Sequence, residues 1–236
     1  MLCDINCDIG EGMLNDEQLM KYISSANIAC GFHAGDDITM NETVRLARKY
    51  DVSIGAHPSF PDRENFGRIE MTLSLNEIYE QVLEQIQILA SVASKHDVVL
   101  KHVKPHGALY NMSAKSQGIA HTIGSAVRYH DANLYVVGLS GSYSISEAKK
   151  LGMKTMSEVF ADRTYQDDGT LTPRSQSGAL IGDTNEAVKQ ALQMVHRKTV
   201  TSVSGKTIPV IAETICVHGD GEHAVEFAKA LYEVLK

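Results

Sequence analysis

The sequence predicts an α/β protein that folds as a distorted (β/α) barrel of parallel strands with helices outside. Short apolar runs rich in β-branched residues alternate with longer stretches of helical periodicity along the 236 residues. This alternation is typical of a parallel sheet covered by helices. It repeats about seven times, which favours a closed or distorted barrel over an open sheet. No linker, low-complexity tract or fixed-period repeat interrupts the chain, so we expect one domain over residues 1–236.

The expected strands are short apolar segments, most of them followed by glycine or by polar residues. The alternation alone does not distinguish seven strands from eight, because two further segments have a weaker strand pattern. The weaker candidates are Thr199–Val203 and Ile208–Ala212. The stronger candidates are Leu2–Cys7, Ser25–Cys30, Val52–Ala56, Val98–Val103, Leu134–Leu139, Lys154–Phe160 and Thr214–Val217.

The clearest helix is Asn76–Ser94, where apolar residues recur on one stripe and Ser74 and Glu77 have the spacing of a capping box. Asn15 is a plausible N-cap for the first helix. The other expected helices are Asp16–Ser24, Thr39–Tyr50, Ser116–His130, Tyr143–Leu151, Thr184–Arg197 and Glu222–Leu235.

The composition excludes several classes of partner. The formal net charge is −7, and an acidic chain repels phosphate backbones, so we expect no nucleic-acid partner. No apolar run approaches the roughly 20 residues that span a bilayer, and the first residues lack the features of a signal peptide. The four cysteines form no CxxC motif and are expected to be reduced thiols. We therefore expect a cytoplasmic protein without membrane contact.

Polar residues gather where the expected strands end. Because the carboxyl ends of parallel barrel strands lie on one face, where active sites are built, these residues are expected to converge. Five of the ten histidines lie at the ends of expected strands, whereas the others fall on helices or helix ends. The five are His33, His57, His102, His106 and His218. This distribution predicts a catalytic or metal site on that face.

The sequence context of six polar residues indicates a catalytic role, although some of them also have a structural explanation. His33 lies between glycines that let the backbone bend around a ligand, and His57 and Lys104 each precede a proline that holds them extended. Glu158 would be costly inside a barrel without a partner, and Asp8 is alternatively a turn cap. The catalytic candidates are Asp8, His33, His57, Lys104, His106 and Glu158.

A second set of residues is expected to bind substrate or phosphate. Asp162 and Arg163 follow a strand, although they can also pair with each other. Arg174 lies in the irregular segment Thr164–Gly182, which we expect to be a mobile loop at the mouth of the site. The binding candidates are Asn6, Asp162, Arg163, Arg174, His218 and Asp220. Any metal ligands are expected among Asp8, His33 and His57.

The same residues form eight motifs in a fixed order. They read Asp4-Ile-Asn6-Cys-Asp8-Ile-Gly-Glu11-Gly, Ser25-Ala-Asn27-Ile-Ala-Cys30-Gly-Phe-His33-Ala-Gly-Asp36, Gly55-Ala-His57-Pro58, Phe66-Gly-Arg68, His102-Val-Lys104-Pro-His106-Gly-Ala-Leu-Tyr110-Asn111, Glu158-Val-Phe-Ala-Asp162-Arg163, Pro173-Arg174-Ser-Gln-Ser-Gly178-Ala and Cys216-Val-His218-Gly-Asp220. Over nearly its whole length the chain resembles the LamB/YcsF family, which provides the A subunit of prokaryotic ATP-hydrolysing 5-oxoprolinase. It departs from the family at Cys7, where alanine is common.

The resemblance implies a distorted barrel of seven strands, related to the glycoside hydrolase and deacetylase barrels. It also implies opening of the lactam of 5-oxo-L-proline to L-glutamate, coupled to hydrolysis of ATP to ADP and phosphate. We therefore expect ATP with Mg²⁺ as co-substrate, 5-oxoproline as substrate, and the B and C subunits as partners. Gly205-Lys206-Thr207 resembles the end of a Walker A loop, but Val200 stands where its first glycine belongs. The phosphoryl-transfer machinery is thus expected partly in other subunits.

Two other functions stay open from the sequence. The chain can be a stand-alone metal-dependent hydrolase, in which Asp8, His33 and His57 hold one divalent ion and a water occupies an open position. It can also be a carrier without catalytic activity that hands a lactam to a partner protein. Activity without ATP, or full activity after loss of Asp8 and His106 together, would distinguish these alternatives from the first.

Overall fold

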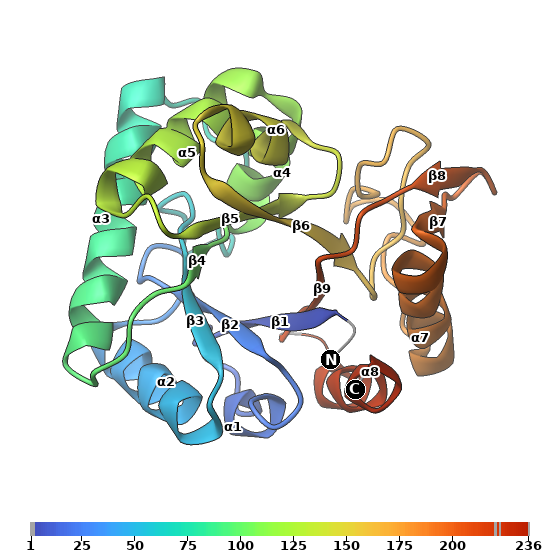
Figure 1. The fold of residues 1–236 in the computed structure, drawn as a ribbon, viewed down its shortest axis with the longest axis horizontal. Helices are drawn as coiled ribbons and strands as arrows, with labels where there is room; N and C mark the ends of the chain where they lie inside the picture. The colour runs from blue at the N-terminus through green and yellow to red at the C-terminus, as the bar shows by residue number, and fades with distance from the viewer. Residues whose placement is uncertain (1–2, 220, 222, 236) are drawn as a thin grey trace.

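A closed barrel of seven parallel strands forms the centre of the molecule. The computed structural model describes residues 3–219, 221 and 223–235. Each strand is hydrogen-bonded to parallel neighbours, and the last strand closes the barrel against the first (Figure 1). In barrel order the strands are β1 (Asp4–Ile9), β2 (Ser25–Ala29), β3 (Ser53–His57), β4 (His102–Val103), β5 (Tyr135–Leu139), β6 (Lys154–Phe160) and β9 (Thr214–Val217). The structure thus confirms the predicted barrel and has seven strands rather than eight.

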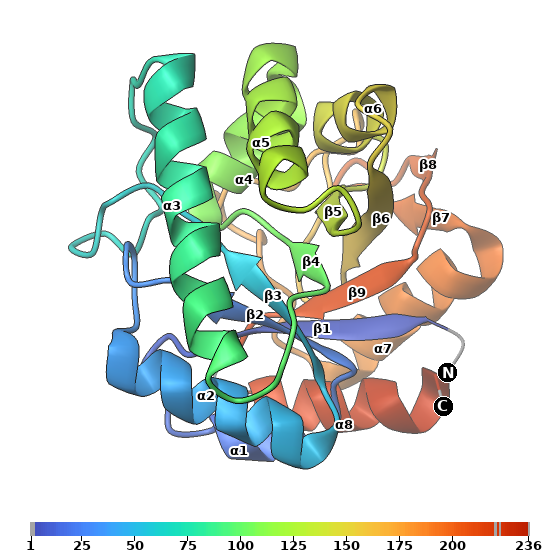
Figure 2. The same cartoon turned by 60° about the vertical axis from the view of Figure 1, so that its left-hand side comes forward.

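Helices cover the outside of the barrel, as the alternation predicts. Figure 2 shows α1 and α8 running beneath β1, and α3 standing upright beside α5. The helices are α1 (Asp16–Leu19), α2 (Asp37–Tyr50), α3 (Leu75–Ser94), α4 (Gly107–Lys115), α5 (Gln117–His130), α6 (Tyr143–Lys150), α7 (Thr184–Leu192), which continues into the π-helical turn η1 (Gln193–Arg197), and α8 (Ala224–Leu235). Among the described residues, no helix is both long enough and apolar enough to cross a membrane.

The two weaker strand candidates lie outside the barrel. They form β7 (Thr199–Thr201) and β8 (Thr207–Pro209), an antiparallel pair that stands with α7 to one side of β6 and β9 (Figure 1). Because the chain leaves the barrel after β6 and returns only at β9, β6 pairs directly with β9. This non-local pairing excludes the eighth strand that the sequence pattern left open.

Some of the predicted helix boundaries and one predicted cap are wrong. The helix expected over Asp16–Ser24 ends at Leu19, and α4 was not predicted because polar residues interrupt its apolar pattern. The Asn15 side chain does not cap α1, since it donates instead to the Gly219 carbonyl oxygen at 3.1 Å. The capping box at the start of α3 is confirmed, with both reciprocal hydrogen bonds present.

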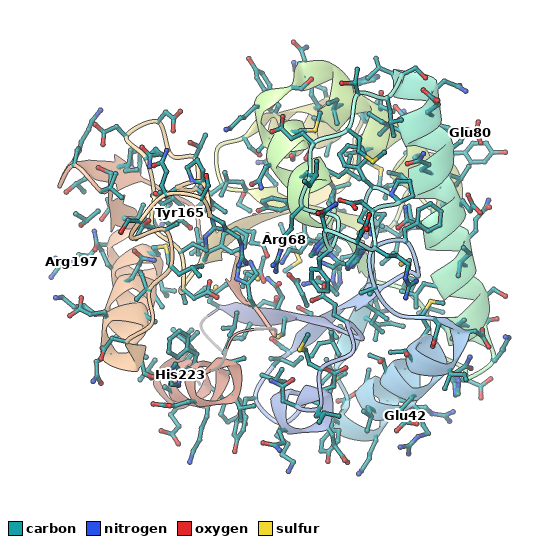
Figure 3. The ribbon with its side chains drawn as sticks, turned by 180° about the vertical axis from the view of Figure 1, so that it is seen from behind. Glu42, Arg68, Glu80, Tyr165, Arg197 and His223 are labelled. Carbon is teal, nitrogen blue, oxygen red and sulfur yellow. The ribbon has the colours of Figure 1, made fainter. Side chains whose placement is uncertain are left out.

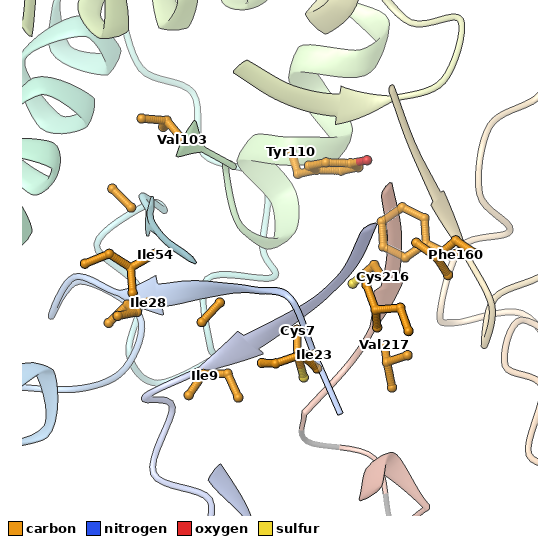
Figure 4. Close-up of a cluster of buried hydrophobic side chains, with 14 of the residues drawn as sticks. Cys7, Ile9, Ile23, Ile28, Ile54, Val103, Tyr110, Phe160, Cys216 and Val217 are labelled. Atoms are coloured by element: carbon orange, nitrogen blue, oxygen red, sulfur yellow. The ribbon is translucent and has the colours of Figure 1, made fainter. Parts of the chain in front are cut away.

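Alternate residues of the strands face two different environments. In β1, Ile5, Cys7 and Ile9 are fully buried among apolar side chains under the helices, and Figure 4 shows part of this apolar cluster. The residues between them, Asn6 and Asp8, are also buried but bond polar partners across the barrel. Since side chains of a strand alternate between its two faces, the barrel interior at this level is polar.

Gly55 on β3 makes room for one of these interior side chains. It is the register partner of His102 on β4, and a Cβ at Gly55 would lie 2.2 Å from the His102 ring. A side chain at position 55 is therefore incompatible with the present position of the imidazole.

Candidate active site

A hydrogen-bonded network fills the barrel interior and fixes the orientation of its amides. The Asn27 amide donates to Asn6 Oδ1 at 2.7 Å and to Asp8 Oδ1 at 2.9 Å. His102 Nε2 lies 2.7 Å from Asn27 Oδ1, and the Asn6 amide donates to Glu158 Oε1 at 2.9 Å. Burial lowers the pKa of His102 to about 4, so the ring is neutral and its Nε2 carries the proton given to Asn27.

Lys104 connects this network to the two buried carboxylates. Its ammonium lies 3.0 Å from Asp8 Oδ1 and 2.8 Å from Glu158 Oε1, with Cys216 Sγ at 3.1 Å. Burial opposes the charged form of Lys104, but the charges of Asp8 and Glu158 outweigh it and raise the pKa of the ammonium well above its usual value. Lys104 and Glu158, two of the catalytic candidates, thus form a compensated ion pair beneath the site.

Asp8 stands between this ion pair and the histidines. Its second oxygen, Oδ2, lies 3.5 Å from His57 Nε2. Burial opposes ionisation of Asp8, yet its interactions with His57 and with the ammonium of Lys104 hold its pKa well below the ordinary value. The carboxylate therefore stays ionised, with one oxygen bound to the network and the other directed toward the histidines.

Three histidines and one glutamate converge above Asp8. His33 Nε2 lies 3.0 Å from Glu11 Oε1, and His106 Nδ1 lies 3.4 Å from the same oxygen. His57 Nε2 is 2.9 Å from His106 Nδ1, and the rings of His33 and His106 stack with centroids 3.9 Å apart. One ligand atom from each of these four buried residues lies within 4.8 Å of the others.

The segment after β3 holds this cluster in place. Phe66 adopts a left-handed backbone conformation, with φ of 58°, which is unusual for a residue with a large side chain and is found at functional sites. Its ring packs edge-on against His33 and His106, and its carbonyl oxygen lies 2.9 Å from His106 Nε2. Gly67 follows, where a Cβ would come within 3.0 Å of His33. This turn therefore requires glycine next to the cluster.

A cavity of about 360 Å³ opens over the carboxyl ends of the strands, within the size range of small-molecule sites. Asp8, Glu11, His57, Lys104 and His106 form its floor. Its upper wall carries several cationic side chains, and Figure 3 shows one of them, Arg68, over the middle of the barrel. The cationic residues of this wall are Arg68, Lys115, Arg163 and Arg174.

The segment Thr164–Gly182 lies at this cavity, as predicted, and its mobility stays a prediction. Residues 170–175 line the wall. Arg163 donates to the carbonyl oxygens of Ala179 and Thr172 from Nε and Nη2, and both of these acceptors are neutral. Burial and the neighbouring charge of Arg174 lower the pKa of Arg163 to about 10. Two adjacent guanidinium groups in one cavity wall favour an anionic ligand.

The structure brings most of the candidates together and separates others. Asp8, His33, His57, His106 and His218 converge on one face, as expected. His33 and Glu158 lie behind the cavity wall, and all four hydrogen-bond capacities of the Asn6 amide are used within the network. Asp162 binds His218 Nδ1 at 2.8 Å rather than pairing with Arg163. Asp220 lies outside the described residues.

Glu11 and Tyr110 are among the cavity residues that were not candidates. Glu11 replaces Asp8 at the histidine cluster, so the expected metal ligand set of Asp8, His33 and His57 does not match the geometry. Tyr110 on α4 lines the cavity and meets Phe160 edge-on with centroids 5.7 Å apart (Figure 4). Glu11 lies between two glycines after the first strand, a signal that was available from the sequence.

These features define a parallel (β/α) barrel with a polar site at the carboxyl ends of its strands. The chain belongs to the LamB/YcsF family, whose model matches residues 3–236. It is 50% identical over 240 residues to a protein of Staphylococcus aureus (strain Newman) that is named as the A subunit of 5-oxoprolinase, covering 100% of this chain and 96% of that relative.

Solved structures agree with this assignment. The lactam utilization protein of Thermus thermophilus has a TM-score of 0.93 and 41% identity, covering 100% of this chain and 96% of that one. A family 4 carbohydrate esterase from Streptomyces lividans has a TM-score of 0.50 at 10% identity, covering 99% of this chain and 86% of that one. This second likeness concerns the fold alone.

Proposed function

We propose that this chain is the component of an ATP-dependent 5-oxoprolinase that binds 5-oxoproline and opens its lactam ring. The observation that carries the proposal is the cavity itself, where an ionised Asp8 faces a wall with two adjacent guanidinium groups, Arg163 and Arg174. 5-Oxoproline is a small anion with an amide ring, so it needs a cationic site for its carboxylate beside groups that act on the ring. The name of the Staphylococcus aureus relative supports the same substrate.

The chemistry requires activation of a stable amide. The γ-phosphoryl group of ATP, with Mg²⁺, is transferred to the lactam oxygen and ADP leaves. Water then adds to the activated carbon and loses one proton. The tetrahedral species breaks the ring C–N bond, the nitrogen takes up a proton, and a γ-carboxyl phosphate of glutamate remains. A second water hydrolyses this acyl phosphate to give glutamate and phosphate. The phosphoryl-transfer step belongs partly to the B and C subunits, since this chain has no recognisable nucleotide-binding motif.

The residues of this chain fit the steps at the ring carbon. Asp8 Oδ2 is the carboxylate oxygen that orients the attacking water and accepts its proton, while Lys104 and Asn27 hold Oδ1. Arg163 and Arg174 bind the substrate carboxylate or the leaving phosphate. Burial and the charge of Glu158 raise the pKa of Tyr110 well above its usual value, so its hydroxyl stays protonated and can donate a hydrogen bond.

The test is to purify the chain alone and together with its other subunits. Glutamate released from 5-oxoproline is measured with and without ATP. We expect turnover only with the complete set of subunits and ATP, and little turnover by the isolated chain. Substantial glutamate release by the pure chain without ATP would contradict the proposal and favour the stand-alone hydrolase. An active complex containing Asp8→Ala and His106→Ala together would favour the carrier.

A further inference from the structure

We propose that Glu11, His33, His57 and His106 form a binding site for one divalent transition-metal ion, with zinc the best match. The inference concerns the protein without its substrate, so it does not depend on the proposed function. It rests on where the imidazole protons must lie, which the neighbours of each ring determine.

Two of the histidines donate their outer proton to a backbone carbonyl. His57 Nδ1 lies 2.7 Å from the Lys104 carbonyl oxygen, and His106 Nε2 lies 2.9 Å from that of Phe66. A carbonyl oxygen only accepts, so both nitrogens carry hydrogen. In their neutral forms, His57 Nε2 and His106 Nδ1 are therefore both unprotonated.

These two unprotonated nitrogens face each other at 2.9 Å. Two lone pairs at this distance repel and cannot form a hydrogen bond. The arrangement is stable only when a cation lies between or beside the two nitrogens.

His33 also donates its outer proton and directs an unprotonated nitrogen into the cluster. The Ser59 hydroxyl donates to the Phe60 carbonyl oxygen at 2.8 Å, so it accepts from His33 Nδ1 at 2.9 Å. The inner nitrogen of a neutral His33, Nε2, is then a lone pair directed at Glu11 Oε1, 3.0 Å away. Three nitrogen lone pairs and one carboxylate oxygen thus point into the same space.

A proton can satisfy one of these contacts, whereas a metal ion satisfies all four. In a tetrahedral zinc site with bonds of about 2.0–2.1 Å, the ligand atoms lie about 3.3–3.4 Å apart. Four of the six distances among these atoms are 2.9, 3.0, 3.4 and 3.9 Å, which bracket that value, and all six are within 4.8 Å. Histidines that bind metals also characteristically donate their other N–H to a carbonyl or similar acceptor, as all three do.

The other possible ligand group is less suitable. Asp8, Cys216 and His218 also approach one another within 4.8 Å. However, Asp8 Oδ1 and the Cys216 sulfur both contact the ammonium of Lys104, and burial raises the pKa of the Cys216 thiol well above its usual value. A protonated thiol beside a buried cation is a poor metal ligand.

The site has a position from which the ion can act on a bound molecule. Glu11, His57 and His106 border the cavity, whereas His33 lies behind them. Asp8 Oδ2 lies 3.5 Å from His57 Nε2, next to the proposed ligands, whereas Asp8 Oδ1 is bound by Asn27 and Lys104. An ion there would face the cavity floor and polarise an oxygen atom of the ligand or water above it.

The experiment measures metal directly. The chain is purified without an affinity tag, and bound Zn, Co, Ni, Mn and Fe are quantified; a metal-stripped sample is titrated with Zn²⁺ by calorimetry. We expect about one ion per chain, and equal binding by the control His196→Ala, an exposed histidine outside the site. His106→Gln should reduce affinity at least about 100-fold. Ser59→Ala, which leaves all four proposed ligands in place but removes the hydroxyl that accepts from His33 Nδ1, should reduce the affinity about 10–100-fold.

Two results would overturn the proposal. One is a stripped wild-type chain that binds Zn²⁺ and the other four metals no more strongly than His106→Gln. The other is a metal-free protein in which ¹⁵N spectra show a proton shared between His57 Nε2 and His106 Nδ1, unchanged after Zn²⁺ is added. Ser59→Ala keeps the test valid if His106→Gln does not fold. Neither readout uses 5-oxoproline or ATP, so failure here is distinct from failure of the proposed function.

Discussion

Replacing Lys104 by methionine should be among the most destabilising changes in the barrel. The ammonium lies between Asp8 and Glu158, at 3.0 and 2.8 Å, and all three side chains are buried. Methionine keeps the length of the side chain but leaves two buried carboxylates without their cation. Removal of one partner of such a pair costs about 3–5 kcal/mol. For a chain of this size, that corresponds to a thermal midpoint lowered by about 6–20 °C.

The assay is thermal and urea unfolding followed by circular dichroism at pH 7.5. Lys101→Met is the matched control, because Lys101 is exposed on the same segment, and its loss should change the free energy of unfolding by less than about 0.5 kcal/mol. Lys104→Met/Glu158→Gln should recover part of the lost stability, because it removes one of the two negative charges. A loss below about 1 kcal/mol in Lys104→Met would refute the role of the ion pair.

Three further predictions rest on single contacts. Gly55→Ala should lower the free energy of unfolding by about 1–3 kcal/mol, because its Cβ would meet the His102 ring. The control is Gly182→Ala, where a Cβ meets nothing within 4 Å. Equal stability of the two variants in urea unfolding would contradict the prediction. The pKa of His102 is about 4 in the folded chain, below its ordinary value of 6.5. Between these two pH values the unfolded chain binds more protons, so the free energy of unfolding decreases as the pH is lowered, by up to roughly 3 kcal/mol. His102→Gln should flatten this pH dependence in urea titrations at pH 7, 6 and 5, and an unchanged slope would exclude the effect. Arg174→Ala should weaken 5-oxoproline binding about 10–100-fold in calorimetry without lowering the thermal midpoint, whereas binding equal to that of the exposed control Arg128→Ala would disprove its role.

The barrel could be predicted because its signals are local. Each strand is a short apolar run, each strong helix has its own periodicity, and strand ends of a parallel barrel meet by geometry. The same reasoning placed His33, His57 and His106 on one face. Pairing of β6 with β9 was not predictable, because the contact joins segments far apart in the chain. The strand expected over Val98–Val103 was recognised, but in the structure β4 comprises only His102–Val103. The helix α4 was missed because its pattern is too polar to recognise.

The composition of the site was predictable, but the division of roles was not. Spacing along the chain cannot show which carboxylate approaches the histidines, and here it is Glu11 rather than Asp8. Nor can it show that Asn6, expected to bind substrate, uses its whole amide inside the barrel. Both outcomes depend on the direction in which alternate strand residues point, which is determined only when the strand register is known.

The most direct test of the account is the activity of the complex that contains Asp8→Asn. Asparagine preserves the size of the side chain while removing the charge that orients and deprotonates water. Glutamate formation from 5-oxoproline and the thermal midpoint are measured on the same preparation. The account predicts turnover lowered by about 10²–10⁴-fold in a protein that still folds. Near-normal turnover, with or without a lowered midpoint, would contradict it.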